Sequence, residues 1–425
     1  MGEILIRNGT IVHSDKQDKK DILIKDNRIS KIGENLTASK VTKIIDAKGL
    51  YIMAGFIDMH CHLREPGLTH KEDITSGANA AVAGGFSTVC CMPNTSPSLD
   101  NVPLISYVIN RAKEVNRAKV LPIGAISKGQ QGKELAPLKS MAAAGAVAFS
   151  DDGLPVENGG LMKLALEYSK SFDLLLITHA EDKTLAGDGV VNEGYHASVA
   201  GLKGIPRTAE DVMTARDIIL AENANARLHV AHVSTKGSVQ LIRDAKKRGV
   251  KVTAETCPHY FSATDSEILG YNTYAKVNPP LREESDVKAI IEGIKDGTID
   301  AIATDHAPHH EDEKNTEFDL APFGISGLET AFSLSYTNLV AKGHISFEKL
   351  SQLLSSNPAK ILGLEKPKIV VGAIADLTIV DIKKSYTVDK DKFLSKGKNS
   401  LFHGKKLTGQ VVNTIVDGDV KYFFR

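Results

Sequence analysis

Two histidines and an arginine follow a short apolar run near residue 60. The run "GFIDM" is followed by His60, Cys61 and His62, and Arg64 lies two residues further on. In an extended strand, neighbouring side chains point to opposite faces, so the two imidazoles share one face and Cys61 points to the other. This spacing can chelate one metal ion. Taken alone the pair is a weak signal, because hydrogen-bonded histidines are common in protein interiors.

Other short apolar runs are also followed by side chains of metal-ligand type or by an amide. His179 follows "LLLIT", His232 follows "RLHVA", Asp305 follows "DAIAT", and Asn94 comes shortly after "STVCCM". A buried cluster of such groups would be costly to desolvate, and a pair of divalent ions would satisfy it. Imidazole and carboxylate ligands without a thiolate favour zinc, with manganese, cobalt or iron as substitutes.

Two neighbouring ions need a shared ligand. The run "AVAFS" ends in Asp151, Asp152 and Gly153. A carboxylate at this point could join two cations and hold a hydroxide between them at neutral pH. Asp-Asp-Gly is also an ordinary turn sequence. Spacing alone does not choose between the two aspartates.

A repeated fold must bring these residues together. From residue 55 to 365, short strand patterns alternate with helical patterns of about 12 to 18 residues. The strand patterns are "GFIDM", "STVCCM", "KVLPIG", "AVAFS", "LLLIT", "RLHVA", "KVTAET" and "DAIAT". Eight such units in about 310 residues predict an α/β fold of the (β/α)8 TIM barrel type, with its site at the carboxyl ends of the strands. A doubly wound sheet would usually show a glycine-rich phosphate loop after its first strand, and "HCHLREPG" is not one.

The two ends of the chain have a different pattern. Residues 1–54 and 366–425 alternate apolar and polar residues between turn pairs such as Asn8-Gly9, which is typical of short antiparallel strands. We therefore predict one small β-sandwich domain built from both ends, beside a catalytic barrel of residues 55–365.

Composition favours a small-molecule partner. Fifty-two basic residues balance 52 acidic ones, and no block of like charge suggests binding to nucleic acid or to a membrane surface. No run approaches the ~20 apolar residues of a membrane span, and the first residues lack a signal-peptide pattern, so we expect a cytoplasmic protein. The four cysteines include no CxxC pair, and we interpret them as reduced core thiols.

Nine motifs together resemble one family. In chain order they are "DMHCHLREPG", "MPNT", "FSDDG", "THAED", "AHVST", "ETCPHY", "NPPLR", "ATDHAPH" and "PFGISGLET". They are similar to the motifs of the long bacterial type of dihydroorotase, in the amidohydrolase superfamily, and span nearly the whole chain. The resemblance implies the reversible hydrolysis of L-dihydroorotate to N-carbamoyl-L-aspartate in de novo pyrimidine (UMP) synthesis.

The resemblance also implies a set of metal ligands with two zinc ions per chain. One ion takes His60, His62 and Asp305, the other takes His179 and His232, and Asp152 bridges them. Many relatives, hydantoinases included, use a carboxylated lysine as the bridge. This chain has no lysine there. The preceding lysine, Lys139, lies in a predicted helix, so we expect an aspartate bridge instead.

The mechanism implied by the family uses a metal-bridged hydroxide as nucleophile and Asp305 as general base. A planar guanidinium suits the substrate carboxylate, and this role falls to Arg64. The other implied substrate contacts are His62, Asn94, Asn278, His309, Phe323 and Gly324. The polar segment 309–324 has no regular pattern, and we expect it to be a mobile cover over the site.

Two other functions are compatible with these patterns. A hydantoinase or allantoinase would catalyse the same reaction class on another ring, but Arg64, Asn94 and the aspartate bridge argue against it. A metal-free scaffold relative would be expected to lose ligands, whereas all six positions are filled here. We also expect a homo-oligomer, either a dimer or a tetramer. The resemblance allows association with aspartate carbamoyltransferase, as in some relatives.

Overall fold

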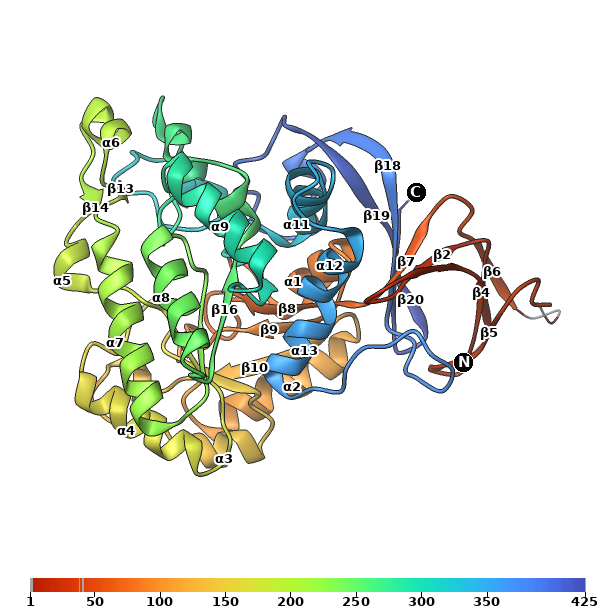
Figure 1. The fold of residues 1–425 in the computed structure, drawn as a ribbon, viewed down its shortest axis with the longest axis horizontal. Helices are drawn as coiled ribbons and strands as arrows, with labels where there is room; N and C mark the ends of the chain where they lie inside the picture. The colour runs from red at the N-terminus through yellow and green to blue at the C-terminus, as the bar shows by residue number, and fades with distance from the viewer. Residues whose placement is uncertain (1–2, 38, 40–41, 425) are drawn as a thin grey trace.

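The eight predicted barrel strands all form and pair in parallel. The computed structural model describes residues 3–37, 39 and 42–424. In the eight-stranded sheet, each strand lies beside the next barrel strand of the chain (Figure 1). The strands are β8 (Phe56–Cys61), β9 (Phe86–Cys91), β10 (Lys119–Gly124), β11 (Ala148–Ser150), β12 (Leu176–Thr178), β15 (Leu228–Val230), β16 (Val252–Thr256) and β17 (Ala301–Ile302). The barrel prediction is confirmed.

The first and last strands meet just beyond their carboxyl ends. Cys61 and His306 form a parallel bridge, and the backbone N–H of His62 donates to the carbonyl of His306 at 2.8 Å. The segment after β17 therefore lies directly beside the HxH pair.

Helices follow the barrel strands and cover them from outside (Figure 1). No helix among the described residues is long and apolar enough to span a membrane. Lys139 lies in a helix as predicted, with its ammonium over the ring of Phe172. The main helices are α1 (Ile74–Ala83), α2 (Val102–Val115), α3 (Leu138–Ala143), α4 (Gly159–Lys170), α7 (Thr208–Ala224), α8 (Lys236–Lys247), α9 (Glu284–Asp296), α11 (Ala331–Ser335), α12 (Phe347–Ser351) and α13 (Asn357–Leu362).

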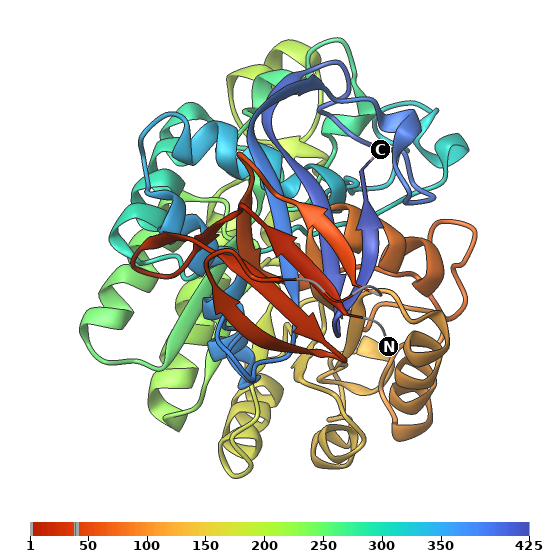
Figure 2. The ribbon, with the colours of Figure 1, turned by 90° about the vertical axis from the view of Figure 1, so that its right-hand side faces the viewer.

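Strands from both chain ends share one six-stranded sheet (Figure 2). In this sheet β7 pairs with β18 on one side and with β2 on the other. Buried isoleucines fill the adjoining core, among them Ile6, Ile22 and Ile379. The pairing supports the small β-domain, whose limits at 1–54 and 366–425 we retain as a proposal. Its strands are β1 (Ile4–Arg7), β2 (Thr10–Val12), β3 (Gln17–Lys19), β4 (Asp21–Lys25), β5 (Arg28–Gly33), β6 (Lys43–Asp46), β7 (Tyr51–Ala54), β18 (Leu377–Thr387), β19 (Lys406–Val416) and β20 (Asp419–Phe423).

The four cysteines are buried and unbonded, as expected for reduced core thiols. Burial raises the pKa of each thiol, that of Cys91 to about 12, so none is a reactive thiolate near neutral pH.

Aromatic packing joins the first two barrel strands to the helix that faces the β-domain. The Phe56 ring lies 5.8 Å from Phe86 and 5.7 Å from Phe332 of α11, measured between ring centroids. All three side chains are buried. Because β8 leads directly into His60 and His62, this aromatic cluster also helps to position the two histidines.

We expect Phe332→Ala to lower the free energy of unfolding by about 3–5 kcal/mol, through lost burial and the cavity left behind. Phe423→Ala is the control, since that side chain is 57% exposed and its loss should cost less than about 0.5 kcal/mol. Melting temperatures from calorimetry measure both. Equal melting temperatures for the two variants would contradict the packing role.

Candidate metal centre and active site

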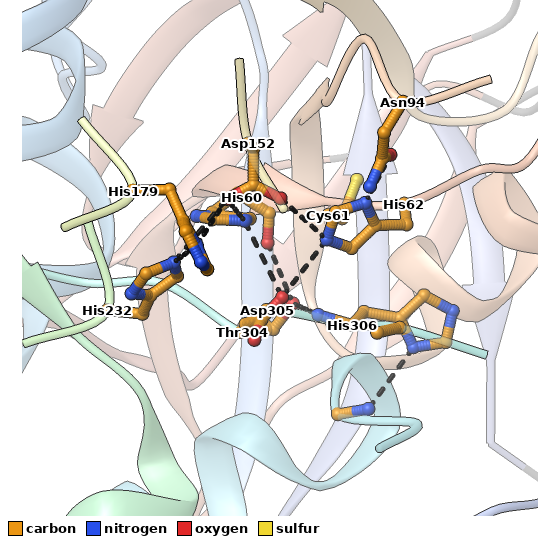
Figure 3. A network of polar contacts seen from close by, with 12 residues as sticks. His60, Cys61, His62, Asn94, Asp152, His179, His232, Thr304, Asp305 and His306 are labelled. Carbon is orange, nitrogen blue, oxygen red and sulfur yellow. Dashed lines mark hydrogen bonds and ion pairs between the residues drawn. The ribbon is translucent and has the colours of Figure 1, made fainter. Parts of the chain in front are cut away.

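One carboxylate lies among four imidazoles at the carboxyl ends of the barrel strands (Figure 3). Asp152 Oδ1 is 3.3 Å from His60 Nε2 and 3.4 Å from both His179 Nδ1 and His232 Nε2. Its other oxygen is 3.4 Å from His62 Nε2. Four strand ends, those of β8, β11, β12 and β15, thus converge on one point.

Asp305 completes the cluster from the side of β17. Its Oδ1 is 3.1 Å from His62 Nε2 and 3.5 Å from His60 Nε2. Two groups of buried ligand atoms lie within 4.8 Å of one another: His60, His62 and Asp305 in one, and His60, Asp152 and His232 in the other. The first group is the ligand set that the family resemblance implies for one ion.

The neighbouring Asp151 is used elsewhere. Its carboxylate accepts hydrogen bonds from the backbone N–H of Ile126 at 2.8 Å and of Ser127 at 3.1 Å, and from the Ser127 hydroxyl. Asp151 therefore fixes the loop after β10, while Asp152 faces the imidazoles.

Three residues of the site have backbone conformations that non-glycine residues rarely adopt. The φ angles of Arg64, His232 and Asp305 are 59°, 36° and 44°. Each such conformation costs about 1–3 kcal/mol and persists only where the surrounding structure enforces it. Each one follows a barrel strand. The side chains of His232 and Asp305 point into the cluster, and that of Arg64 lines the cavity beside it.

Hydrogen bonds to the outer nitrogens orient the rings. The Nδ1–H of His60 donates to Glu255 Oε1 at 3.0 Å, which directs Nε2 toward the centre, where it would be available to a metal ion. His62 Nδ1 is likewise 2.8 Å from Asn94 Oδ1. On the far side, His179 Nε2 is 3.3 Å from Glu181 Oε2, and its Nδ1 faces Asp152.

Three acidic residues around the site, Glu255, Glu181 and Asp58, were not predicted from the sequence. A signal was present for Asp58, because it alternates with His60 and His62 along one strand face. Its carboxylate accepts from the Thr304 N–H at 2.9 Å and the Thr304 hydroxyl at 2.6 Å, directly before Asp305. Glu255 and Glu181 each stand inside a quoted motif, but nothing local distinguishes them from strand or loop residues.

The donor set fits a divalent ion. Nε2 of His60 and Oδ1 of Asp152 are buried and, within the part of the chain that the structure describes, have no hydrogen-bond partner. Burial disfavours the charged form of either group, but their mutual attraction outweighs it. The pKa of His60 lies well above its ordinary value and that of Asp152 well below. A cation between these atoms would satisfy both.

The predicted site residues meet in one cavity of about 280 Å³. Eleven of the twelve predicted site residues line this cavity. The twelfth, His60, is fully buried. Two further lining residues are Glu181 and Lys183, which form an ion pair. Whether each lining residue binds substrate or metal stays a prediction.

The segment 309–324, predicted to be a mobile cover, includes a short helix and a buried lysine, and its mobility stays a prediction. It contains α10 (Glu311–Lys314), and Lys314 is 1% exposed. The Lys314 ammonium donates to the carbonyls of Pro322, Thr273 and Lys276 at 2.7, 3.0 and 3.3 Å. This lysine holds the segment beside the cavity.

Comparison with known proteins identifies the family. The chain is 53% identical over 419 residues to a dihydroorotase of Acetivibrio thermocellus, covering 98% of each chain. It is also 53% identical to a dihydroorotase of Caldanaerobacter subterraneus, covering 99% of this chain and 97% of that one. The chain belongs to the dihydroorotase family. A family model described as dihydro-orotase-like matches residues 49–238 of this family member.

Solved structures show the wider group to which the dihydroorotase family belongs. The L-hydantoinase (dihydropyrimidinase) of Arthrobacter aurescens superposes with a TM-score of 0.88 at 28% identity, covering 99% of this chain and 96% of that one. The expected metal-dependent cyclic amide hydrolase of the amidohydrolase superfamily is therefore confirmed, and the expected barrel with it.

We expect Glu255→Gln to weaken the binding of a divalent metal by about 10- to 100-fold, because the amide cannot accept from both His60 and His229. Titration against a chromophoric chelator measures this. Glu222→Gln removes an exposed glutamate that pairs with Arg248 and should leave the affinity unchanged. Equal affinity in both variants would contradict the orienting role of Glu255.

Proposed function

We propose that this protein hydrolyses the ring amide of L-dihydroorotate, reversibly, to N-carbamoyl-L-aspartate in pyrimidine synthesis. The supporting observation is a buried guanidinium that has no acidic partner among the described residues, in the same cavity as the histidine and carboxylate cluster. Among cyclic amides, dihydroorotate carries a ring carboxylate, and hydantoin and dihydrouracil do not.

The guanidinium belongs to Arg64. Its Nε donates to the carbonyl of Pro308 at 3.3 Å, and no described carboxylate lies within 4 Å of it. Burial lowers its pKa from 12.5 to about 10, although Asp305 and Asp152 act in the opposite direction. The group therefore stays charged at neutral pH. A substrate carboxylate would accept its remaining N–H donors in a bidentate contact.

His309 and Asn94 flank the guanidinium in the proposed carboxylate site. His309 Nε2 lies 2.8 Å from the Phe323 carbonyl, which can only accept, so Nε2 carries the hydrogen. Burial and the nearby Arg64 lower the pKa of His309, so the ring is neutral. The side-chain oxygen of Asn94 accepts a hydrogen bond from His62, so its amide N–H groups are available to donate to an anion.

The substrate ring would lie against the other side of the cavity. Asn278 lines it and donates to both oxygens of Glu181 at 3.3 Å. Phe323 and Gly324 line it next to His309. Backbone groups at Gly324 can contact a flat ring closely because this residue has no side chain and a φ of 145°.

We further propose that the cluster holds two zinc ions, with Asp152 as the shared ligand. His60, His62 and Asp305 would bind one ion, and His179 and His232 the other. Bound ions of this kind supply a water-derived nucleophile at neutral pH and polarise the amide carbonyl.

Asp305 is the proposed general base and acid. Its carboxylate would take a proton from the attacking water and deliver it to the leaving ring nitrogen. Burial raises the pKa of Asp305, but the neighbouring His62 and His60 outweigh this and lower it to about 2, so the carboxylate is ionised at neutral pH.

Three further proposals concern the protein as a whole. We infer a homo-oligomer, either a dimer or a tetramer, located in the cytoplasm. Association with aspartate carbamoyltransferase is the corresponding proposal for a partner protein. All three rest on the family and on the balanced charge of the chain.

Asp305→Asn should keep the fold but reduce kcat by about 100-fold or more, because the amide cannot accept and return a proton. Circular dichroism and metal analysis check that fold and ions remain. Near-normal kcat across the pH range would exclude Asp305 as the general base.

Arg64→Ala should lower kcat/KM for dihydroorotate by about 30- to 1,000-fold, which corresponds to a lost charge-assisted contact of roughly 2–4 kcal/mol. Dihydrouracil has the same ring without the carboxylate, so its kcat/KM should change little. Steady-state kinetics on both substrates measure the difference.

Arg64→Lys is the matched control for this experiment. It keeps the charge without the planar fork and should restore activity only in part. If Arg64→Ala lowers kcat/KM for both substrates by the same factor, Arg64 supports the fold or the metal centre and the proposed substrate loses its main support.

A further inference from the structure

A buried asparagine from the C-terminal part of the chain reaches the rim of the cavity. Asn399 lies between β18 and β19 and is 2% exposed. Its Nδ2 donates to the carbonyl of Gly324 at 3.0 Å and to that of Ala307 at 3.1 Å. Its Oδ1 accepts from the backbone N–H of His309 at 3.0 Å. The orientation of the amide follows, because the carbonyls can only accept and the N–H can only donate.

These three bonds join the two ends of one loop of the proposed substrate site. Ala307 and His309 lie at its start, after β17, and Gly324 lies at its end. The two ends are in direct contact, since a Cβ on Gly324 would lie 2.5 Å from the Ala307 oxygen. One side chain thus fixes the position of His309 relative to Gly324.

The segment that carries Asn399 is itself fixed. The Ser326 N–H donates to the Asn399 carbonyl at 2.8 Å, and the Ser326 hydroxyl lies 2.7 Å from the Gly397 carbonyl and 2.9 Å from Asn399 Oδ1. Ser395 bonds to the buried Glu72. A Cβ on Gly397 would lie 2.5 Å from the Pro308 Cβ, so the segment around Asn399 is in direct contact with the loop after β17.

We propose that Asn399 is a positioning residue for substrate binding, and that the C-terminal segment around it is a structural part of the active site. Only an asparagine-like group can donate to two carbonyls and accept from one N–H at this position. Alanine would leave all three backbone groups without this partner. Aspartate would set a negative charge against two carbonyl oxygens. The inference rests on the proposed function, because it assigns His309 and Gly324 to substrate.

The test compares Asn399→Ala with Asn413→Ala in the full-length, metal-loaded protein. Asn413 is a buried asparagine on β19 whose amide atoms have no partner among the described residues, so its removal controls for loss of a buried amide. We expect Asn399→Ala to raise KM for dihydroorotate by about tenfold or more, with kcat reduced less and metal content unchanged, since misplaced binding groups weaken substrate contacts. Asn413→Ala should keep the wild-type KM.

A purely structural role has a different signature. It would lower the melting temperature and the amount of active enzyme, and hence the apparent kcat, while KM stays constant. That result would overturn the proposal. Should Asn399→Ala fail to fold, Ser326→Ala takes its place, because it removes one support of Asn399. It should raise KM about twofold or more, and an unchanged KM would count against the proposal.

Hydrogen–deuterium exchange separates this inference from the proposed function. Peptides covering residues 305–310 and 322–327 should exchange faster in Asn399→Ala than in Asn413→Ala, whatever the substrate is. If the wild-type protein did not turn over dihydroorotate, the proposed function would fail, and the exchange rates would still decide the role of Asn399. Equal exchange in the two variants would refute it.

Discussion

The attraction between Asp152 and the imidazoles around it is the interaction on which the site depends. Charged groups with no access to water are unstable unless they are paired. Pairing at 3.3–3.4 Å requires the ends of separate strands to be fixed to within a fraction of an ångström. A parallel barrel meets this requirement, because its strands are tied on both sides by backbone hydrogen bonds. The aromatic cluster at Phe56 and the β-domain strands that pack nearby then support β8 from below.

A second layer of polar groups turns this framework into a binding centre. Glu255, Asn94 and Glu181 each engage the outer nitrogen of a histidine, so the inner nitrogen faces the centre. Ring orientation is therefore set before any ligand binds. The strained backbone at His232 and Asp305 has the same consequence, because it points both side chains at a fixed position. The surrounding barrel enforces these unfavourable φ angles.

Much of this arrangement could be predicted from the sequence, and the limits have physical causes. The eight strands were evident because short apolar runs alternate with helical patterns along the middle of the chain, and the shared face of His60 and His62 follows from strand geometry. The choice of Asp152 over Asp151 depends on which side chain turns inward after β11, and both aspartates look alike in sequence. Asn399 could not be predicted, because no local pattern links it to His309, 90 positions away.

The residues of the site lie on two kinds of element, the ends of barrel strands and the loops that follow them. The groups proposed for the chemistry lie at strand ends, where backbone pairing limits movement. The groups proposed for recognition, Arg64, His309 and Gly324, lie on loops, and we propose that side chains such as Asn399 and Lys314 hold them in position. Loops can change without disturbing the strands, which explains how a hydantoinase at 28% identity retains the fold with a TM-score of 0.88. Selectivity among cyclic amides should therefore depend on how these loops are held together, and residues outside the barrel become part of that selectivity.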